Sequence, residues 1–221
     1  EFSLSRGGKT LIGTTAKEEV ATTIFSSKLL SPGQKDLFNN DLKVESSDFV
    51  KTSANRIKPV LLKAAHKNVV ITSKNGVDAI LNNCPVEDLK FETIYCVGRR
   101  TKRLIEQKIG PVKHSEKNAK ALANYLVDYI EGSEVTYFCS DIRMDDLPVI
   151  LEEGNINVQE IEVYSTKLES PKLEKTIEGV MFYSPSTIQS FLQKNTPDCI
   201  AYCIGESTAK EAKKHFKDVR V

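Results

Sequence analysis

The chain has 221 residues, which is enough for one large domain or two small ones. Its 31 Lys and Arg residues against 30 Asp and Glu residues give a net charge of +1, which excludes a general attraction to nucleic acid or to an anionic membrane. No apolar run approaches the length of a membrane span, and we expect no secretory signal peptide because no long apolar stretch follows the first residues. A site for an anionic ligand must therefore be built locally, from a few side chains and backbone N–H groups.

The cysteine pattern predicts a cytoplasmic protein with reduced thiols. The number of cysteines is odd, and none of them forms a C-x-x-C pair. No further Cys or His pair completes a zinc set, so we expect no metal site. The five residues are Cys84, Cys96, Cys139, Cys199 and Cys203.

Residues 1–23 lie outside the pattern of the remaining chain. We interpret them as an N-terminal extension or a segment introduced by cloning, which could add one strand. They contain GGKT at 7–10, but a phosphate-binding loop needs a Gly five residues before Gly8, where Ser3 stands. We therefore do not expect a nucleotide site in this segment.

An internal repeat organises the rest of the chain. Residues 24–52 align without a gap to residues 138–166, so that Ser26 meets Ser140. Both copies have an apolar strand, a polar turn, a short helix and a second strand that ends in Thr. Further matches follow in the same order: 69–81 with 180–192, and 94–107 with 201–214. Three ordered matches predict a chain made by duplication of one α/β unit.

Helix signals agree with the repeat. Ser31 and Asp145 fall at the expected N-caps of the two short helices, and Pro32 and Pro148 lie in their first turns. Between the copies, the apolar residues of 119–130 have the spacing of an amphipathic helix. Short apolar strands that alternate with helices predict parallel sheets covered on both faces. We therefore expect an α/β fold of two similar doubly wound parallel-sheet lobes with a cleft between them.

Candidate ligand-binding residues lie in four turns that connect a predicted strand to a helix. In open parallel sheets, ligands bind beyond the carboxyl ends of the strands, where helix N-termini favour carboxylate or phosphate groups. One such turn is often no more than a helix cap, but four turns on two lobes favour a shared anion-binding cleft. Arg143 could add a charge-assisted contact or could be a solvated cation. The turn residues are Thr72, Ser73, Asn75, Gly98, Thr101, Ser184, Ser186, Gly205 and Thr208.

Familiar catalytic motifs do not occur in the chain. His66, His114 and His215 lie in polar stretches without partner residues at a useful spacing, and we expect them on the surface. No G-x-S-x-G, H-E-x-x-H or G-x-G-x-x-G sequence is found. An enzyme built on this chain would need a reaction that demands little acid–base or nucleophilic machinery.

The ordered motifs of residues 24–221 resemble the uroporphyrinogen-III synthase family. They are VVITSKNGVDAI, YCVGRRTKRLIEQKIG, RMDDLPVILEEGNINVQEIEVYST, MFYSPSTIQSFL and YCIGESTAKEA. No motif is very specific alone, but the ordered set over nearly the full chain is specific. The resemblance implies a lyase of haem biosynthesis that converts the linear tetrapyrrole hydroxymethylbilane to uroporphyrinogen III, with loss of water and inversion of the last pyrrole ring. It implies no metal or organic cofactor.

The resemblance also implies two lobes joined by a pair of linker strands. The first lobe would combine residues 24–47 with 167–221, and the second would be residues 48–166 with linkers at 48–52 and 162–166. The expected partners are the substrate hydroxymethylbilane and, in a transient hand-over, hydroxymethylbilane synthase. We expect a monomer that binds neither nucleic acid nor membrane.

Particular residues match or depart from the family pattern. The family's linker tyrosine falls on Tyr164, whose phenol could donate a hydrogen bond to the departing hydroxyl or could pack its ring between the lobes. The first strand of the family usually ends in Thr-Arg, which is Ser27-Lys28 here. Both residues are expected to bind substrate, and the lysine keeps a cation without the bidentate grip of arginine.

Two other classes of protein remain as alternatives. A non-catalytic two-lobed module could close on a polyanionic small molecule, although most such modules are exported. A signalling or flavodoxin-like module is disfavoured because the chain shows no acidic phosphorylation pocket and no flavin loop.

Overall fold

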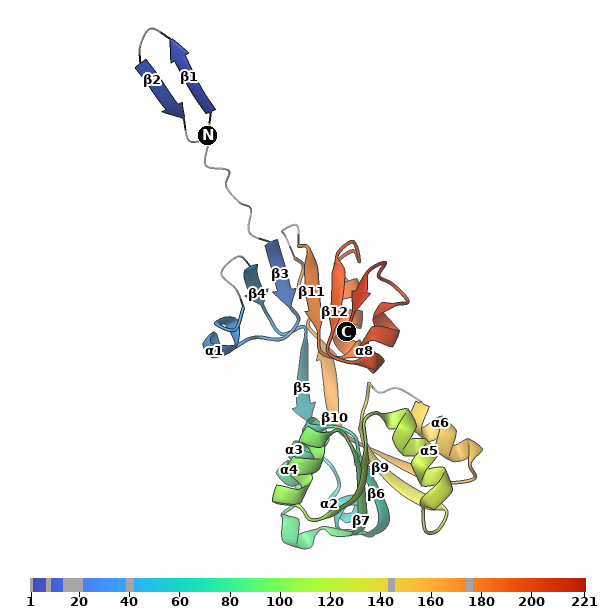
Figure 1. Ribbon diagram of the computed structural model, residues 1–221. Helices are drawn as coiled ribbons and strands as arrows, with labels where there is room; N and C mark the ends of the chain where they lie inside the picture. Colours follow the sequence, from blue (N-terminus) through green and yellow to red (C-terminus); the bar gives the residue numbers. More distant parts are fainter. Residues whose placement is uncertain (1, 7–8, 14–21, 39–41, 143–145, 174–176) are drawn as a thin grey trace.

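The structure is a computed structural model that describes residues 2–6, 9–13, 22–38, 42–142, 146–173 and 177–221. The strands of these residues form three separate sheets (Figure 1). The smallest is a hairpin of β1 (Phe2–Arg6) and β2 (Lys9–Gly13). The N-terminal segment thus adds two strands rather than one. Lys9 begins a strand where a phosphate loop would lead into a helix, so the hairpin excludes that interpretation of GGKT.

The five-stranded sheet combines segments from both ends of the chain. Its order is β13-β12-β11-β3-β4, and all neighbouring strands are parallel. The strands are β3 (Thr22–Ser26), β4 (Leu42–Ser46), β11 (Gly179–Phe182), β12 (Ile200–Cys203) and β13 (Val219–Arg220). The helices that accompany it are α1 (Pro32–Lys35), α7 (Pro185–Leu192) and α8 (Glu206–Ala212).

The six-stranded sheet comes from the middle of the chain. Its order is β5-β10-β9-β6-β7-β8, and only the β5–β10 pair is antiparallel. The strands are β5 (Val50–Ala54), β6 (Ala65–Ile71), β7 (Lys90–Val97), β8 (Val112–Glu116), β9 (Glu134–Ser140) and β10 (Asn157–Leu168). Its helices are α2 (Pro59–Lys63), α3 (Lys74–Asn83), η1 (Val86–Asp88), α4 (Arg99–Lys108), α5 (Ala119–Tyr129) and α6 (Asp146–Glu153).

Helices cover both faces of the six-stranded sheet. Val69 and Ile71 of β6 pack into one core with side chains of α3 and α4, whereas Val70 between them packs into a second core with α5 and α6. Successive side chains of a strand point to opposite faces, so a strand buried on both sides has a continuous apolar sequence. The expectation of an α/β fold with parallel, doubly covered sheets is confirmed for this part of the chain.

The two larger sheets have the same topology. The order β13-β12-β11-β3-β4 corresponds strand by strand to β8-β7-β6-β9-β10. The antiparallel pair β5–β10, which connects the two parts in Figure 1, places Thr52 opposite Thr166. These are the two residues that the sequence repeat equates, so they lie where an approximate two-fold axis between the halves would pass. This arrangement agrees with the predicted duplication.

The gapless alignment was wrong in one strand. Ser26 lies opposite Met181, and at the corresponding place in the other sheet Tyr137 lies opposite Val70. Ser26 is therefore the counterpart of Tyr137 and not of Ser140. The strand β9 continues past Tyr137 to Ser140, whereas β3 ends at Ser26, so the alignment needs a gap of three residues between this strand and the equated pair Thr52 and Thr166.

Helix α5 has no counterpart beside the five-stranded sheet in the part of the chain that the structure describes. In the six-stranded sheet, the Asn68 amide donates hydrogen bonds to the carbonyls of Glu131 and Glu134, at the connection that follows α5. The corresponding residue of the other sheet is Gly179, where a Cβ would lie 2.5 Å from Cε2 of Tyr202. The Tyr202 ring thus packs directly against the backbone of Gly179, and a residue with a side chain at this position would clash with the ring.

Most helix signals read from the sequence agree with the structure. Ser31 is the N-cap of α1, Pro32 is its first residue, and Pro148 lies in the first turn of α6. The predicted amphipathic helix of 119–130 is α5. Asp145, the other predicted N-cap, lies outside the described residues. All five cysteines are free thiols, four of them buried and one half-buried.

The prediction that His66 lies on the surface was wrong. The strand β6 begins at Ala65, several residues before the expected strand, and the imidazole is only 5% exposed. Its Nε2 lies 2.8 Å from the Leu61 carbonyl oxygen and its Nδ1 lies 2.9 Å from Oγ1 of Thr136. Both ring nitrogens therefore have hydrogen-bond partners within the protein, and His66 is a structural residue of the core.

Candidate active site

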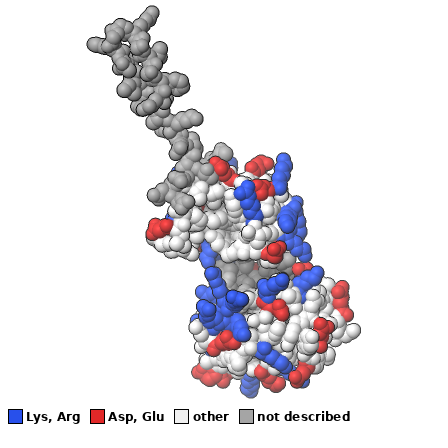
Figure 2. Space-filling model, in the orientation of Figure 1, with Lys and Arg blue, Asp and Glu red and all other residues white. Residues whose placement is uncertain are grey.

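A large cleft lies between the five-stranded and six-stranded sheets. Its volume is about 1010 Å³, and residues of both sheets and of their helices line it. In Figure 2, Lys and Arg side chains gather on both sides of the waist between the two halves of the molecule. The helix starts of α3 and α5 face the cleft from one half, and those of α7 and α8 face it from the other. Such a cleft fits an elongated anionic ligand.

The turn between β6 and α3 supplies one wall. Thr72, Ser73 and Asn75, which the sequence predicted to bind a ligand, all line the cleft. Ser73 is the N-cap of α3, and its Oγ accepts a hydrogen bond from the Gly76 N–H at 3.1 Å. Oγ1 of Thr72 lies 3.2 Å from the phenol oxygen of Tyr137, which also faces the cleft. Hydroxyls and the positive end of a helix are thus directed at the same space.

The turn between β11 and α7 forms the corresponding wall of the other half. Ser184 and Ser186 line the cleft, and their hydroxyl oxygens are 2.9 Å apart. Ser184 is the N-cap of α7, and its Oγ accepts from the Thr187 N–H at 3.4 Å. The repeat equates Ser184 with Ser73, so two equivalent helix caps face one cleft.

The other two turns contribute less than the sequence suggested. Thr101 and Thr208 are 7% and 2% exposed, and neither they nor the preceding glycines Gly98 and Gly205 line the cleft. Both threonines are the third residue of their helix, where the side chain turns back onto the sheet. Ser207, between Gly205 and Thr208, reaches the cleft instead.

Two further predicted residues do not line the cleft, and a third lies outside the described residues. Ser27 is 1% exposed, and its hydroxyl donates to the Met181 carbonyl at 2.8 Å, which leaves it no access to a ligand. Lys28 is exposed but is not part of the lining. Arg143 lies outside the described residues.

Tyr164 reaches the cleft from the antiparallel strand pair. A β-bulge between Glu162 and Tyr164 interrupts the pairing of β10 with β9, and Val163 at the bulge is fully buried. Such a bulge changes the direction of the following side chain, and Tyr164 packs one side of its ring on the core while it lines the cleft. The hydroxyl of Ser73 donates to its phenol oxygen at 3.0 Å.

The environment of Tyr164 keeps its phenol protonated. Burial raises its pKa above the ordinary value of 10.0, and the hydrogen bonds of Ser73 and Ser140 act in the opposite direction. A raised pKa means that the neutral phenol, which can donate a hydrogen bond, persists through neutral pH. Tyr164 can therefore act as a proton donor in the cleft.

Apart from Tyr164, sequence reasoning missed the lining residues that are not in the four turns. Asn118 is the N-cap of α5, and its side chain accepts from the Ala121 N–H at 2.8 Å. The sequence predicted the helix but not that its first turn faces the cleft, although the preceding polar segment at 113–118 could have indicated it. Other lining residues that were missed are Thr52, Lys117, Lys120, Asn124, Ser140, Thr166, Gln189, Lys210 and Lys214.

Charges of both signs line the cleft. The Lys210 ammonium lies 3.7 Å from the Asp146 carboxylate, and this ion pair connects α8 of one half to α6 of the other. Lys214 lies 2.6 Å from Glu211 and, by hydrogen bonding, holds the pKa of that carboxyl below its ordinary value. Lys117 and Lys120 beside α5 have no ion pair among the described residues. Cations are thus available to an anionic ligand at the start of α5.

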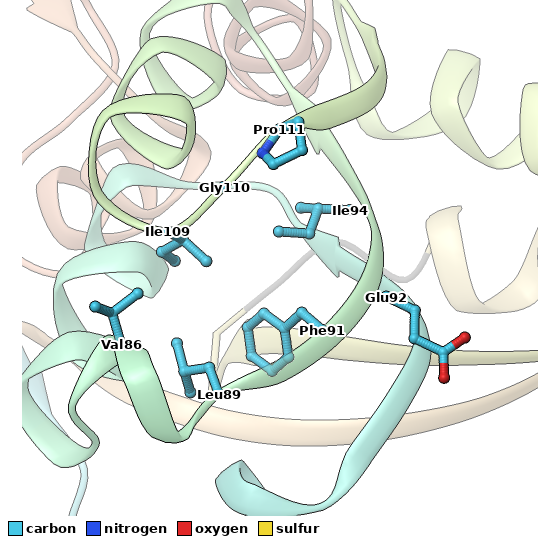
Figure 3. A pocket seen from close by; sticks show the side chains of 8 residues that line it. All are labelled: Val86, Leu89, Phe91, Glu92, Ile94, Ile109, Gly110 and Pro111. Carbon is cyan, nitrogen blue, oxygen red and sulfur yellow. The ribbon is translucent and has the colours of Figure 1, made fainter.

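A second, smaller cavity lies at the opposite end of the six-stranded sheet. Its volume is about 120 Å³, and Figure 3 shows apolar side chains around it, with the Glu92 carboxylate directed away. It offers no set of polar groups for catalysis.

Among the described residues, no group of three or more His, Cys, Asp and Glu side chains could hold a metal ion. Within the residues that the structure describes, none of the helices has both the length and the apolar composition that a membrane span requires.

Comparisons with known proteins agree on one family. A family model described as Uroporphyrinogen-III synthase HemD matches residues 42–220, which include all of the six-stranded sheet and most of the five-stranded sheet. No curated protein sequence matches the chain.

Solved structures with a similar fold carry the same family name. Uroporphyrinogen-III synthetase from Helicobacter pylori 26695 has 17% identity and a TM-score of 0.61, with 90% of this chain and 92% of that chain covered. A mutant uroporphyrinogen III synthase from the extremely thermophilic bacterium Thermus thermophilus has 12% identity and a TM-score of 0.66, with 91% and 93% covered. At such identities the similarity establishes the fold, and the family model establishes the family.

Proposed function

The chain belongs to the uroporphyrinogen-III synthase family, and we propose that it converts hydroxymethylbilane to uroporphyrinogen III with loss of water and inversion of the last pyrrole ring. The match of the family model over residues 42–220 is the observation that carries this proposal. The cleft supports it, because a volume of about 1010 Å³ suits a tetrapyrrole and its walls suit carboxylates.

The substrate would be held by its acetate and propionate groups. The backbone N–H groups of the helix starts that follow Ser73 and Ser184, together with the Ser184 hydroxyl, would meet carboxylates from opposite sides, and Lys117 and Lys120 would add charge-assisted hydrogen bonds. Contacts from both halves would hold the two ends of the linear molecule near one another. Much of the rate enhancement would then come from this positioning.

Tyr164 would assist the departure of water. The bond between the hydroxymethyl carbon and its oxygen breaks, and the oxygen takes the phenol proton and leaves as water. The carbon that has lost the hydroxyl forms a bond to the substituted α-carbon of the last pyrrole ring, and the older bond from that ring carbon to its neighbouring methylene carbon breaks. That methylene carbon then bonds to the free α-carbon of the ring, which releases a proton and restores the phenol. The protonated state of Tyr164 at neutral pH and its place in the cleft support this role.

We further propose that the chain divides into lobes at 24–47 plus 167–221 and at 48–166, and that it acts as a cytoplasmic monomer without a cofactor. The separate five-stranded and six-stranded sheets support the division. A transient complex with hydroxymethylbilane synthase would deliver the unstable substrate.

Incubation with hydroxymethylbilane, followed by chromatographic separation of the product isomers, tests the proposed reaction. Hydroxymethylbilane closes spontaneously to the type I isomer, so the proposal predicts type III product in proportion to the amount of protein. A mixture that contains only the type I isomer, with tetrapyrrole bound to the protein, would instead identify a binding module.

A further inference from the structure

We propose that Ser73 is a positioning residue, which fixes the direction of the Tyr164 hydroxyl rather than binding substrate itself. The inference rests on the proposed function, because it assigns to Tyr164 the proton that the departing hydroxyl receives. The sequence placed Ser73 among the substrate ligands. The hydrogen bonds around it indicate a different role.

The hydrogen-bonding capacity of Ser73 is used within the protein. Its Oγ accepts from the Gly76 N–H at 3.1 Å and donates its one proton to the phenol oxygen of Tyr164 at 3.0 Å. A serine hydroxyl has a single donor, so Ser73 has no proton left for a substrate carboxylate. A chain of hydrogen bonds therefore runs from the first turn of α3 to the phenol.

This chain determines what Tyr164 can do with its own proton. The phenol oxygen accepts from Ser73, and the O–H bond is therefore directed away from that hydroxyl. The ring packs on the core of the six-stranded sheet and the residue lines the cleft, where Ser140 also hydrogen-bonds the phenol, so Ser73 and Ser140 together set the direction of the O–H bond beside the space for the ligand. Without Ser73, the phenol could rotate its proton toward other acceptors.

The other half of the molecule contains a matched cap that lacks the phenol. Ser184, the residue equated with Ser73, accepts from the Thr187 N–H and lies 2.9 Å from the Ser186 hydroxyl. Both serines start a helix and line the same cleft. A purely structural role as a helix cap would therefore give the two residues equal importance, whereas a positioning role gives Ser73 the larger effect on turnover.

Kinetics of three variants separate these roles. Ser73→Ala should lower kcat roughly 10-fold, a part of the 10²–10⁴-fold that a proton donor provides, with KM changed less than about twofold. Ser184→Ala should raise KM with kcat changed less than about twofold, and Ser73→Thr, which keeps the cap and the donor, should restore kcat. Equal changes in Ser73→Ala and Ser184→Ala would overturn the proposal, as would the failure of Ser73→Thr to restore kcat.

A spectroscopic measurement tests the link without relying on activity. Protein labelled with ¹³C at tyrosine Cζ gives an NMR signal for Tyr164 that Tyr164→Phe removes and so identifies. At neutral pH this signal should shift in Ser73→Ala and stay in place in Ser184→Ala. An unmoved signal in Ser73→Ala would contradict the link. The absence of type III product from the wild-type protein would defeat the proposed function alone and leave this measurement valid.

Discussion

The two halves of the molecule share a topology but not a chemistry. Tyr164 of the β10 strand and Val50 of the β5 strand are equated by the repeat, and both line the cleft. One offers a phenol and the other a hydrocarbon. Likewise, the cap residue Ser73 contacts a phenol, whereas its counterpart Ser184 contacts another serine. Two walls of similar construction thus differ at equivalent positions, and the proposed proton donor lies on only one of them.

The presence of α5 beside only one sheet adds to this difference. The start of α5 brings Lys117, Asn118 and Lys120 to the cleft, whereas the lysines that the other half contributes, Lys210 and Lys214, are paired with Asp146 and Glu211. A substrate whose ends must be told apart can be held in one direction only by unequal walls. The asymmetry is therefore as important for the proposed reaction as the shared fold.

The largest expected effect comes from removing the phenol. Tyr164→Phe should lower kcat about 100-fold or more, with little change in KM, because the departing hydroxyl loses its proton donor. The matched variant Val50→Ala, at the equivalent position, should change KM more than kcat. Steady-state kinetics with isomer analysis measure both, and an unchanged kcat for Tyr164→Phe would remove this residue from the mechanism.

The difference in packing between the two sheets can be tested through stability. Gly179→Ala should lower the free energy of unfolding by about 1–3 kcal/mol, because the new methyl group meets the Tyr202 ring at 2.5 Å and the Ile200 carbonyl oxygen at 3.1 Å. Denaturant titration monitored by circular dichroism measures the change. The exposed Gly33, where a Cβ would meet nothing within 4 Å, provides the control Gly33→Ala.

The lysines at the start of α5 should affect binding more than turnover. The double variant Lys117→Met, Lys120→Met should raise KM roughly 10-fold and weaken its dependence on salt, because two charge-assisted contacts with carboxylates are lost. The control pair Lys67→Met, Lys90→Met changes exposed lysines at the opposite end of the strands. A similar KM for the two double variants would show that the start of α5 does not bind substrate.

The ion pair across the cleft should have the smallest effect. Asp146→Asn releases Lys210 to a substrate carboxylate and should lower KM about twofold, a small change because an exposed ion pair contributes little. Lys210→Met should act in the opposite direction and raise KM. A rise in KM for Asp146→Asn would show that the carboxylate supports the cleft rather than competing for the lysine.

Much of the fold followed from local patterns. Apolar runs of strand length, Gly and Ser turns and the repeat predicted parallel sheets, and the turns at Ser73 and Ser184 lie where the pattern placed them. The register of β3 could not be predicted, because it depends on hydrogen bonds to β11, which is distant in the sequence. The buried place of His66 depends likewise on Phe91 and Phe138 from other strands.

The site residues could be predicted only in part, again for a physical reason. The turn motifs identified hydroxyl residues but not the direction of each side chain, so Thr101 and Thr208 were predicted to bind ligand although they point into the core. Lys117 and Lys210 carry no motif, and only the packing of α5 and α8 brings them to the cleft. Strand–turn–helix patterns locate a site in an α/β sheet, and tertiary packing selects its residues.

NMR mapping of bound product tests most directly whether two unlike walls hold one tetrapyrrole. Uroporphyrinogen III, kept anaerobic, is titrated into ¹⁵N-labelled protein while the backbone amide signals are followed. We predict that the amides that follow Ser73, Ser184 and Asn118 shift together and saturate at one equivalent of ligand. Shifts confined to one sheet, or located outside the cleft, would contradict the account.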